Sequence, residues 1–314
     1  MIFDTMLITG CGGDIALALA RIARECGVVR RLIGCDIHDD HPGSAFYDKL
    51  ARAPRADDPT YLEGLKSIVT TNGVDVIVPM SEAEMTTLLS ADACSEIDGV
   101  PVIMANRVAV TIGLDKLATI DTLARNGVPT PWTEIVGSAL PASLPCIFKL
   151  RRGQGSKELR RVETADDVER LSREKIGELW QELLLPDDQE YTCGLYRCRN
   201  GEIRTLAFRR KLQGGLTRSG HVVDSTAINT LLERIAVVLD LFGSINVQLR
   251  LTAGGPKVFE INPRFSSTVC FRHKMGFRDF VWSLLERKGL AIEAYCPPRP
   301  GTRFYRGATE IIIS

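Results

Sequence analysis

The chain has 314 residues, of which 45% are hydrophobic and 25% charged, and its 39 basic and 39 acidic side chains give a formal net charge of zero. This composition is that of a globular protein with room for about two or three packed units. Because no extensive Lys/Arg cluster is present, nucleic acids and membrane surfaces are not expected as partners. No apolar run reaches about 18 residues, and Met1 leads directly into a predicted core strand. The nine cysteines are scattered without a C-x-x-C pair, which favours free thiols in a reducing cytoplasm over disulfides or zinc.

Residues 1–105 alternate between strand and helix patterns, which predicts a parallel sheet with right-handed crossovers. Strands are expected over 6–9, 31–36, 74–79 and 100–104, and a helix over 15–26. Gly10 and Gly12 lie in the first strand-to-helix turn, and Asp36 ends the second strand, where a dinucleotide-binding fold would place a ribose-binding acid. Because Ile15 occupies the position of the third glycine of that fingerprint, a tight turn is the favoured explanation.

The middle of the chain carries a lysine on each of two predicted elements. Asp115 and Lys116 begin a predicted helix, and Lys149 lies on a predicted buried strand over 146–150. A cation among apolar neighbours is costly unless it is paired. The glycine-containing segment 151–157 follows, and its backbone N–H groups could cradle polyphosphate while Lys149 supplies charge. Taken alone, Lys116 would more often be a solvated cation.

The sequence then predicts strands over 191–198 and 203–209, a loop over 211–225, and a helix over 228–239 that Gly243 ends as a C-cap. His221 lies in the predicted loop, where a lone histidine is usually structural, and Asp224 is a candidate cap of the helix. Arg209, Arg210 and Arg218 are candidates to bind a substrate carboxylate. Plain surface charge is the alternative for each of them.

A predicted hairpin near the end of the chain is its most informative segment. Its strands are expected over 246–251 and 257–262, around a glycine-containing turn. Side chains of a strand alternate between faces, so Glu260 and Asn262 should point together. By the same alternation, Phe259 and Ile261 should point into a core.

Four oxygen-bearing side chains converge on one face if this hairpin is symmetric about Gly254, because paired residues of antiparallel strands share a face. The two expected pairs are Gln248 with Glu260 and Asn246 with Asn262. Carboxylate and amide oxygens are ligands that suit Mg²⁺. Arg264 can extend the same face and place a cation beside the metal. The alternative is an amphipathic edge hairpin with a polar outer face.

These residues also carry a resemblance to a known family. Glu260-x-Asn262-Pro-Arg264 on one strand, with Asn246-x-Gln248 on its partner, resembles the metal-binding core of the ATP-grasp superfamily, and most closely the branch of carbamoyl-phosphate synthetase and biotin carboxylase. The resemblance implies an α/β (α+β) ATP-grasp fold that begins with a Rossmann-like parallel-sheet domain. The implied parts are a Rossmann-like domain over 1–105, an ATP-grasp lid subdomain over 106–185 and a C-terminal subdomain with the metal site over 186–314.

The resemblance assigns roles to residues whose motifs occur in family order between 106 and 266. The implied ligands of Mg²⁺ (or Mn²⁺) are Gln248, Glu260 and Asn262. The implied catalytic residues, near the acyl phosphate, are Arg264, His221 and Asn246. The residues implied to bind ATP are Lys116, Lys149, Gly153, Gly155, Ser156, Glu182, Leu183, Leu185 and Glu190. The chain departs from the family at Leu150, where proline commonly follows the lysine.

The resemblance implies a ligase in which ATP phosphorylates a carboxylate and an amine displaces phosphate, giving an amide, ADP and phosphate. A carboxylase that acts on bicarbonate is an alternative. Two alternatives from other classes are a nicotinamide dehydrogenase that uses the Gly10 turn and Asp36, and a non-catalytic ATP-binding or scaffold protein. The expected partners are a small-molecule carboxylate, an amine and, as the commonest oligomer, a second copy in a homodimer.

Overall fold

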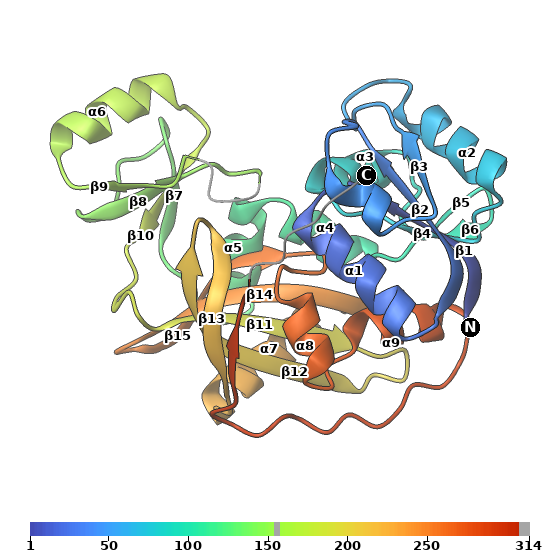
Figure 1. The fold of residues 1–314 in the computed structure, drawn as a ribbon. Helices are drawn as coiled ribbons and strands as arrows, with labels where there is room; N and C mark the ends of the chain where they lie inside the picture. Colours follow the sequence, from blue (N-terminus) through green and yellow to red (C-terminus); the bar gives the residue numbers. More distant parts are fainter. Residues whose placement is uncertain (154–157, 308–314) are drawn as a thin grey trace.

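The computed structural model describes residues 1–153 and 158–307, and its larger sheets define three units. In Figure 1 the N-terminal unit lies at the upper right in blue, a small unit lies at the upper left in green, and a large antiparallel sheet runs beneath both. The mixed α/β architecture predicted from the sequence is confirmed. Among the described residues, no helix is long and apolar enough to cross a membrane.

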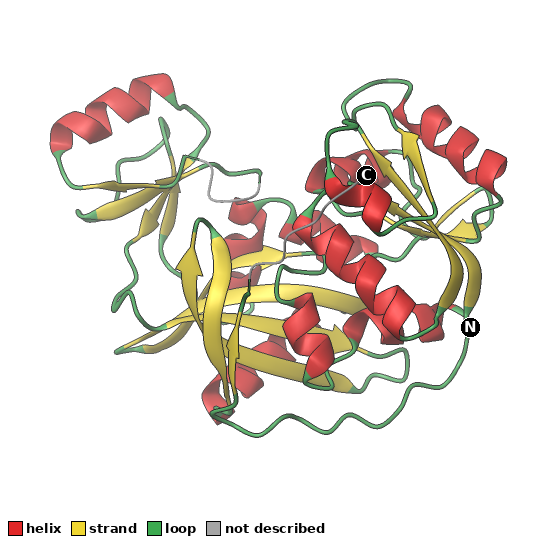
Figure 2. Ribbon diagram, viewed as in Figure 1, coloured by secondary structure: helices red, strands yellow, loops and turns green. Residues whose placement is uncertain are grey.

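A four-stranded parallel sheet in the order β3-β2-β1-β4 forms the centre of the N-terminal unit, with helices on both sides (Figure 2). Its elements are β1 (Phe3–Thr9), α1 (Asp14–Glu25), β2 (Val29–Asp36), the 3-10 turn η1 (Pro42–Ala45), β3 (Lys49–Arg52), α2 (Tyr61–Asn72), β4 (Val76–Val78) and α3 (Glu82–Ser90). The predicted strands over 6–9, 31–36 and 74–79 and the helix over 15–26 are confirmed. The predicted strand over 100–104 is confirmed only in part: β6 (Val100–Pro101) pairs antiparallel with β5 (Glu96–Ile97), and Val102 forms a single parallel bridge to Ile77 of β4.

A second four-stranded sheet, in the order β7-β10-β8-β9, forms the small unit. Its elements are β7 (Thr133–Ile135), β8 (Cys146–Lys149), β9 (Arg160–Val162), α6 (Ala165–Glu174) and β10 (Leu179–Glu182), and α4 (Arg107–Gly113) and α5 (Lys116–Arg125) precede it. Phe148 and Trp180 fill its core, with ring centroids 5.7 Å apart. The predicted start of α5 is confirmed, because the Asp115 side chain accepts hydrogen bonds from the backbone N–H groups of Leu117 and Ala118.

A six-stranded antiparallel sheet in the order β15-β14-β11-β12-β13-β16 forms the largest unit. Its elements are β11 (Glu190–Arg197), β12 (Ile203–Gln213), β13 (Leu216–Val223), α7 (Thr226–Val238), β14 (Gly243–Thr252), β15 (Gly255–Asn262), α8 (Val269–Lys274), α9 (Asp279–Arg287) and β16 (Arg303–Tyr305). The prediction of a loop over 211–225 is wrong, because β12 and β13 form a hairpin there. The predicted C-cap is also wrong: Leu239 caps α7, and Gly243, at φ +93°, begins β14.

The two faces of this large sheet pack against different helices. Cys193 and Val247 face one side and pack in one apolar cluster with Ile228 of α7. Phe208 faces the other side and packs in a second cluster with Trp282 of α9. Because strand residues alternate between faces, odd-numbered residues of β11 and β12 face α7 and even-numbered ones face α8 and α9.

A fully buried ion pair lies beneath the α8–α9 face. The Arg272 guanidinium is 3.5 Å from the Asp279 carboxylate, and the two side chains are 0% and 1% exposed. Ser244, near the start of β14, donates to the same carboxylate at 2.7 Å, and Arg272 donates to Ser266, just beyond β15, at 3.0 Å. Gly194 of β11 provides the space, because a Cβ atom there would lie 2.5 Å from the guanidinium. The pair therefore connects both ends of the β14–β15 hairpin to the helices.

We predict that Asp279→Asn lowers the free energy of unfolding by roughly 3–5 kcal/mol, because it leaves the buried Arg272 guanidinium uncompensated. Urea unfolding followed by circular dichroism measures the change. Asp240→Asn is the matched control: its partner is Arg197, its side chain is 88% exposed, and it should cost no more than about 1 kcal/mol. Equal losses of unfolding free energy in the two variants would show that the buried pair stabilises the protein no more than a surface pair does.

Candidate functional site

The pairing of β14 and β15 creates a polar face at the centre of the molecule. Its register pairs Gln248 with Glu260 and Asn246 with Asn262, as the sequence predicted. The turn is not symmetric about Gly254, however. Thr252 pairs with Gly255, and the register shifts by one residue between Gln248 and Leu249, which leaves Phe259 as the extra residue of a β-bulge.

The bulge also changes the position of Phe259. The sequence placed this side chain in a core, which is wrong: it is half-buried and lines a cavity. Its carbonyl oxygen accepts a hydrogen bond from Lys149 Nζ of β8 at 3.0 Å. The unpaired residue of a bulge bends its strand and leaves the ladder, which explains both observations. Ile261 lies in the core as predicted.

The polar side chains of this face differ in their hydrogen-bond and ion-pair partners. Gln248 Oε1 accepts a hydrogen bond from Arg210 at 2.6 Å, and Asn246 Oδ1 accepts one from Thr192 at 2.9 Å. Asn262 is 5% exposed, and its buried Nδ2 has no hydrogen-bond partner among the described residues. The Glu260 carboxylate has a lysine 4.0 Å away as its ion-pair partner in the described chain. Carboxylate and amide oxygens lining one cavity fit Mg²⁺ or Mn²⁺.

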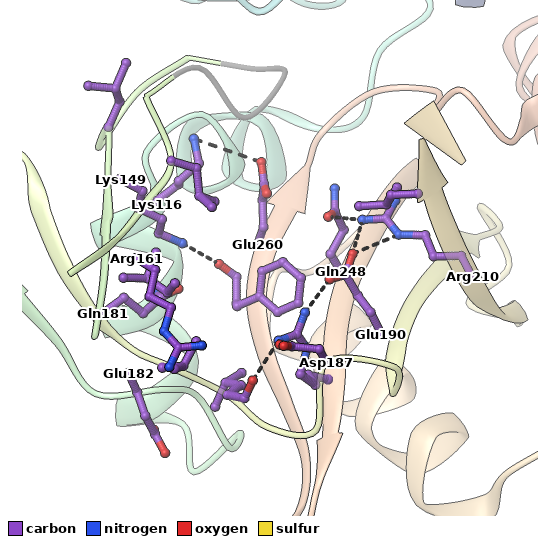
Figure 3. Close-up of a pocket in the computed structure, with 18 of the residues that line it drawn as sticks. Lys116, Lys149, Arg161, Gln181, Glu182, Asp187, Glu190, Arg210, Gln248 and Glu260 are labelled. Atoms are coloured by element: carbon purple, nitrogen blue, oxygen red, sulfur yellow. Dashed lines mark hydrogen bonds and ion pairs between the residues drawn. The ribbon is translucent and has the colours of Figure 1, made fainter. Parts of the chain in front are cut away.

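A cavity of about 350 Å³ separates the small sheet from the β14–β15 hairpin (Figure 3). Leu183, Leu184 and Phe259 contribute apolar walls. Figure 3 shows Glu190 and Arg210 on the wall opposite Gln181 and Glu182. The cavity therefore combines apolar walls with many charged side chains, which suits a charged small molecule that also has an apolar part.

Lys116 and Lys149 both line this cavity, and Glu260 is the acid that lies near them in the described chain. Lys149 is 5% exposed, and burial lowers its pKa to about 7, an effect that Glu260 opposes and Lys116 reinforces. Lys116 Nζ donates to the carbonyl oxygen of Gly153 at 2.6 Å and lies 4.0 Å from Glu260. Two cations near one acid favour the binding of an anion such as a polyphosphate.

Glu190, one of the residues expected to bind ATP, is held by two arginines. Glu190 accepts from Arg210 at 2.7 Å and from Arg250 at 2.6 Å. Arg250 also donates to the Leu184 carbonyl oxygen at 2.6 Å, so it fixes the chain that lines the cavity. Sequence reasoning missed Arg250, although its signal was present: it follows Gln248 by two residues and therefore lies on the same face of β14.

The remaining residues expected to bind ATP differ in where they lie. Glu182 lies in the cavity wall, but Lys257 binds its two carboxylate oxygens at 2.8 and 2.7 Å. Leu183 lines the cavity, whereas Leu185 is 53% exposed and lies outside it. The predicted residues Gly155 and Ser156 fall outside the part of the chain that the structure describes.

A second cavity, of about 540 Å³, adjoins the first and lies between the polar face and the N-terminal unit. The residues that line both cavities are Arg210, Leu212, Gln248 and Glu260. Arg264, Asn246 and Asn262 line only the second one. Arg264 lies 3.9 Å from Glu82 of α3, and burial raises the pKa of that glutamate.

The Gly10 turn forms the opposite wall of this second cavity. The Asp36 carboxylate accepts three hydrogen bonds from backbone N–H groups. One comes from Gly12 in the turn at 3.0 Å, and two come from its own loop, from Ile37 at 2.7 Å and His38 at 3.3 Å. Asp36 therefore stabilises the turn itself. This geometry favours the tight-turn explanation over the dinucleotide-binding one.

His221 does not join the other predicted catalytic residues. It pairs with Arg209 across β12 and β13, whereas Arg210, the next residue, points into the cavities. His221 therefore faces the other side of the sheet and lines a separate, third cavity. The reason is that residues 216–223 are a strand, in which alternation fixes the face. Asp224 does not cap α7 either, because its carboxylate accepts from Asn229 and Ser225 is the N-cap residue.

Comparisons with known proteins find similar sequences over part of the chain. Residues 181–305 match the family model described as ATP-grasp in the biosynthetic pathway with Ter operon. A carbamoyl-phosphate synthase of Methanobrevibacter smithii is 31% identical over 124 residues, which cover 37% of this chain and 34% of that protein. The match thus spans about a third of that relative's length.

Solved structures resemble the chain over nearly its whole length. N5-carboxyaminoimidazole synthetase from Staphylococcus aureus, complexed with ADP, has a TM-score of 0.73 at 18% identity, covering 96% of this chain and 80% of that one. The biotin carboxylase domain dimer of 2-oxoglutarate carboxylase from Hydrogenobacter thermophilus, in complex with MgADP, ADP and bicarbonate, has a TM-score of 0.73 at 16% identity, covering 94% and 72%. At these identities the likeness is one of fold.

We predict that Lys149→Met stabilises the protein increasingly as the pH falls from about 10.5 to 7. The pKa of Lys149 is lowered in the folded state to about 7, so the unfolded chain binds a proton that the folded one does not. In wild type, the free energy of unfolding should rise with pH in this range by up to about 1.4 kcal/mol per unit relative to Lys149→Met. Urea titrations at pH 7, 8 and 9 test this, and parallel pH profiles would contradict it.

Proposed function

We propose that this chain is an ATP-grasp enzyme, an ATP-dependent carboxylate–amine ligase that forms an amide through an acyl phosphate and releases ADP and phosphate. The match of residues 181–305 to an ATP-grasp family model supports this assignment. The observation that carries the proposal is the position of Glu260. Its carboxylate lines both the cavity that contains Lys116 and Lys149 and the cavity that contains Arg264. A phosphoryl group could therefore pass from one cavity to the other at this residue.

In this proposal the 350 Å³ cavity binds ATP. The adenine lies against Phe259, Leu183 and Leu184, and the Glu190 carboxylate accepts hydrogen bonds from the ribose hydroxyls. The phosphates lie toward Lys116 and Lys149, which share Glu260 as the nearby acid in the described chain. A bound phosphate would favour the protonated form of Lys149, which burial disfavours.

Gln248, Glu260 and Asn262 would hold the Mg²⁺ (or Mn²⁺), which supplies positive charge at the phosphates when bound. Arg210 and Arg264 would then release the amide oxygens of Gln248 and Asn262, which accept from them in the absence of ligand. These arginines become available for anionic substrate groups. Phosphoryl transfer needs mainly positioning and charge neutralisation, which this arrangement can supply.

The carboxylate substrate would occupy the 540 Å³ cavity. One of its oxygens attacks the γ-phosphorus, and ADP leaves. Arg264 orients the substrate and neutralises the acyl phosphate, while Asn246 lies beside it. The amine then attacks the acyl carbon, the C–O bond breaks, and phosphate leaves with that oxygen and takes up the proton that the amine nitrogen loses. His221 has no place in this step, because it faces the third cavity.

The carboxylase alternative uses the same residues with bicarbonate as the carboxylate. A solved neighbour of similar fold is described in complex with MgADP and bicarbonate, which favours keeping this candidate. A non-catalytic ATP-binding protein would bind MgATP without ADP release. The division into units at about 105 and 185, a homodimer and a cytoplasmic location also stay part of the proposal.

We predict that Glu260→Gln leaves the protein folded but lowers the rate of ADP formation about 10²–10³-fold, because one charged element at the phosphates is lost. A coupled ADP assay over a panel of amino acids, small peptides and sugar acids, with and without added amines, provides the measurement. Glu134→Gln is the control, since this residue is exposed on β7 and lines none of the cavities described here. Turnover of Glu260→Gln at the wild-type rate would remove the proposed metal site.

We further predict that ¹⁸O placed in the substrate carboxylate appears in inorganic phosphate during turnover, one atom per phosphate. With the acid present and the amine omitted, hydroxylamine should trap the activated acyl group as a hydroxamate. Mass spectrometry of phosphate and of the hydroxamate gives both results. AMP and pyrophosphate as products, or phosphate without label, would exclude the acyl-phosphate route.

A further inference from the structure

The third cavity is larger than the two already described, at about 780 Å³. It lies between the segment that precedes β11 and the edge of the sheet formed by β12, β13 and β16, where Figure 1 shows β16 beside β13. Its lining includes four cationic side chains, Arg209, Arg210, Lys211 and Arg303, and the imidazole of His221. None of the steps proposed above uses it.

Three of these basic side chains lie in register across neighbouring strands. Arg209 of β12 pairs with His221 of β13, and His221 pairs in turn with Arg303 of β16. In the next row, Lys211 of β12 lies opposite Ser219 of β13. Basic side chains from three neighbouring strands therefore gather at this edge of the sheet.

The acids that line this cavity already form ion pairs with arginines. Asp188 binds Arg209 at 2.6 Å, Asp187 binds Arg250 at 3.0 Å, and Glu190 binds Arg210 and Arg250. In contrast, no acid within residues 1–153 and 158–307 lies within ion-pair distance of Lys211, His221 or Arg303. The cavity therefore has an excess of basic side chains.

We propose that this cavity binds a phosphorylated small molecule. A phosphate group carries more than one negative charge and accepts hydrogen bonds from several donors, which matches a cluster of arginine, lysine and histidine side chains. Tyr305, 68% exposed at the same cavity, offers a ring face for the rest of the ligand. The volume exceeds that of a single phosphate, so the ligand has room for further atoms.

The proposed site is separate from the nucleotide cavity but shares a wall with it. Asp187, Glu190, Arg210 and Leu212 line both cavities, whereas Lys211, His221 and Arg303 line only the third. Lys149 lines only the nucleotide cavity. Substitutions can therefore test each cavity separately, and phosphate binding at the third cavity does not depend on the function proposed above.

The test is calorimetric titration of the full chain with inorganic pyrophosphate in the presence of EDTA. The variants are Lys211→Gln/Arg303→Gln for the third cavity and Lys149→Met for the nucleotide cavity. Arg299→Gln is the matched control, because this exposed arginine lies four residues before Arg303 and outside the cavity. Binding of MgADP to each variant is measured separately and reports only on the proposed function.

We expect pyrophosphate to bind wild type, Lys149→Met and Arg299→Gln, and to bind Lys211→Gln/Arg303→Gln at least about tenfold more weakly, because two charged donors are lost. Loss of binding in Lys149→Met alone would place the anion in the nucleotide cavity and overturn the proposal. An equal loss in Arg299→Gln would indicate general surface charge and overturn it as well. So would the absence of binding to wild type at millimolar pyrophosphate.

Discussion

The register of β14 and β15 is the constraint on which the rest of the site depends. A two-residue turn without a bulge would pair Glu260 with Val247, whose side chain packs in the apolar cluster of α7. A shift of one residue turns every side chain of a strand to its opposite face. The single extra residue, Phe259, corrects the shift and places Glu260 opposite Gln248. It also provides the carbonyl oxygen that holds Lys149, so one bulge positions the acid and the cation together.

The surroundings of the hairpin hold this register in place. Ser244 and Ser266, at its two ends, are hydrogen-bonded to Asp279 and Arg272, which form a buried pair. Breaking such a pair is costly, because either charge left alone is buried without a partner. The Arg272–Asp279 pair therefore affects the site by positioning. It fixes the start of β14 and the path of the segment that contains Arg264 and precedes α8.

The sequence correctly predicted the two residue pairs of the hairpin, but the turn geometry from which they were derived is not the one observed. The symmetric turn assumed for it does not occur, and the shorter turn is offset by a bulge that no residue pattern indicated. His221 shows the opposite case. Because residues 216–223 were interpreted as a loop, alternation could not be applied, and the family motif alone placed this histidine at the phosphates. The third cavity could not be predicted either, since it requires Arg303, which joins β13 as an edge strand some 80 residues later in the chain.

The end of β15 also connects the hairpin to the N-terminal unit. Pro263 packs so closely on α4 that a Cβ atom on Gly113 would lie 3.0 Å from its ring, and Arg264 reaches Glu82. The substrate cavity thus has two walls with different tasks. The polar face of the hairpin is committed to charge neutralisation in the proposed reaction. In the proposed reaction, selection among acids and amines would fall to the apolar residues of this cavity, which are Ile15 and Met80 of the N-terminal unit and Leu216 of the β12–β13 hairpin. Changes at those three positions would then alter the substrate without disturbing the chemistry, because the proposed arrangement places none of them at the phosphates.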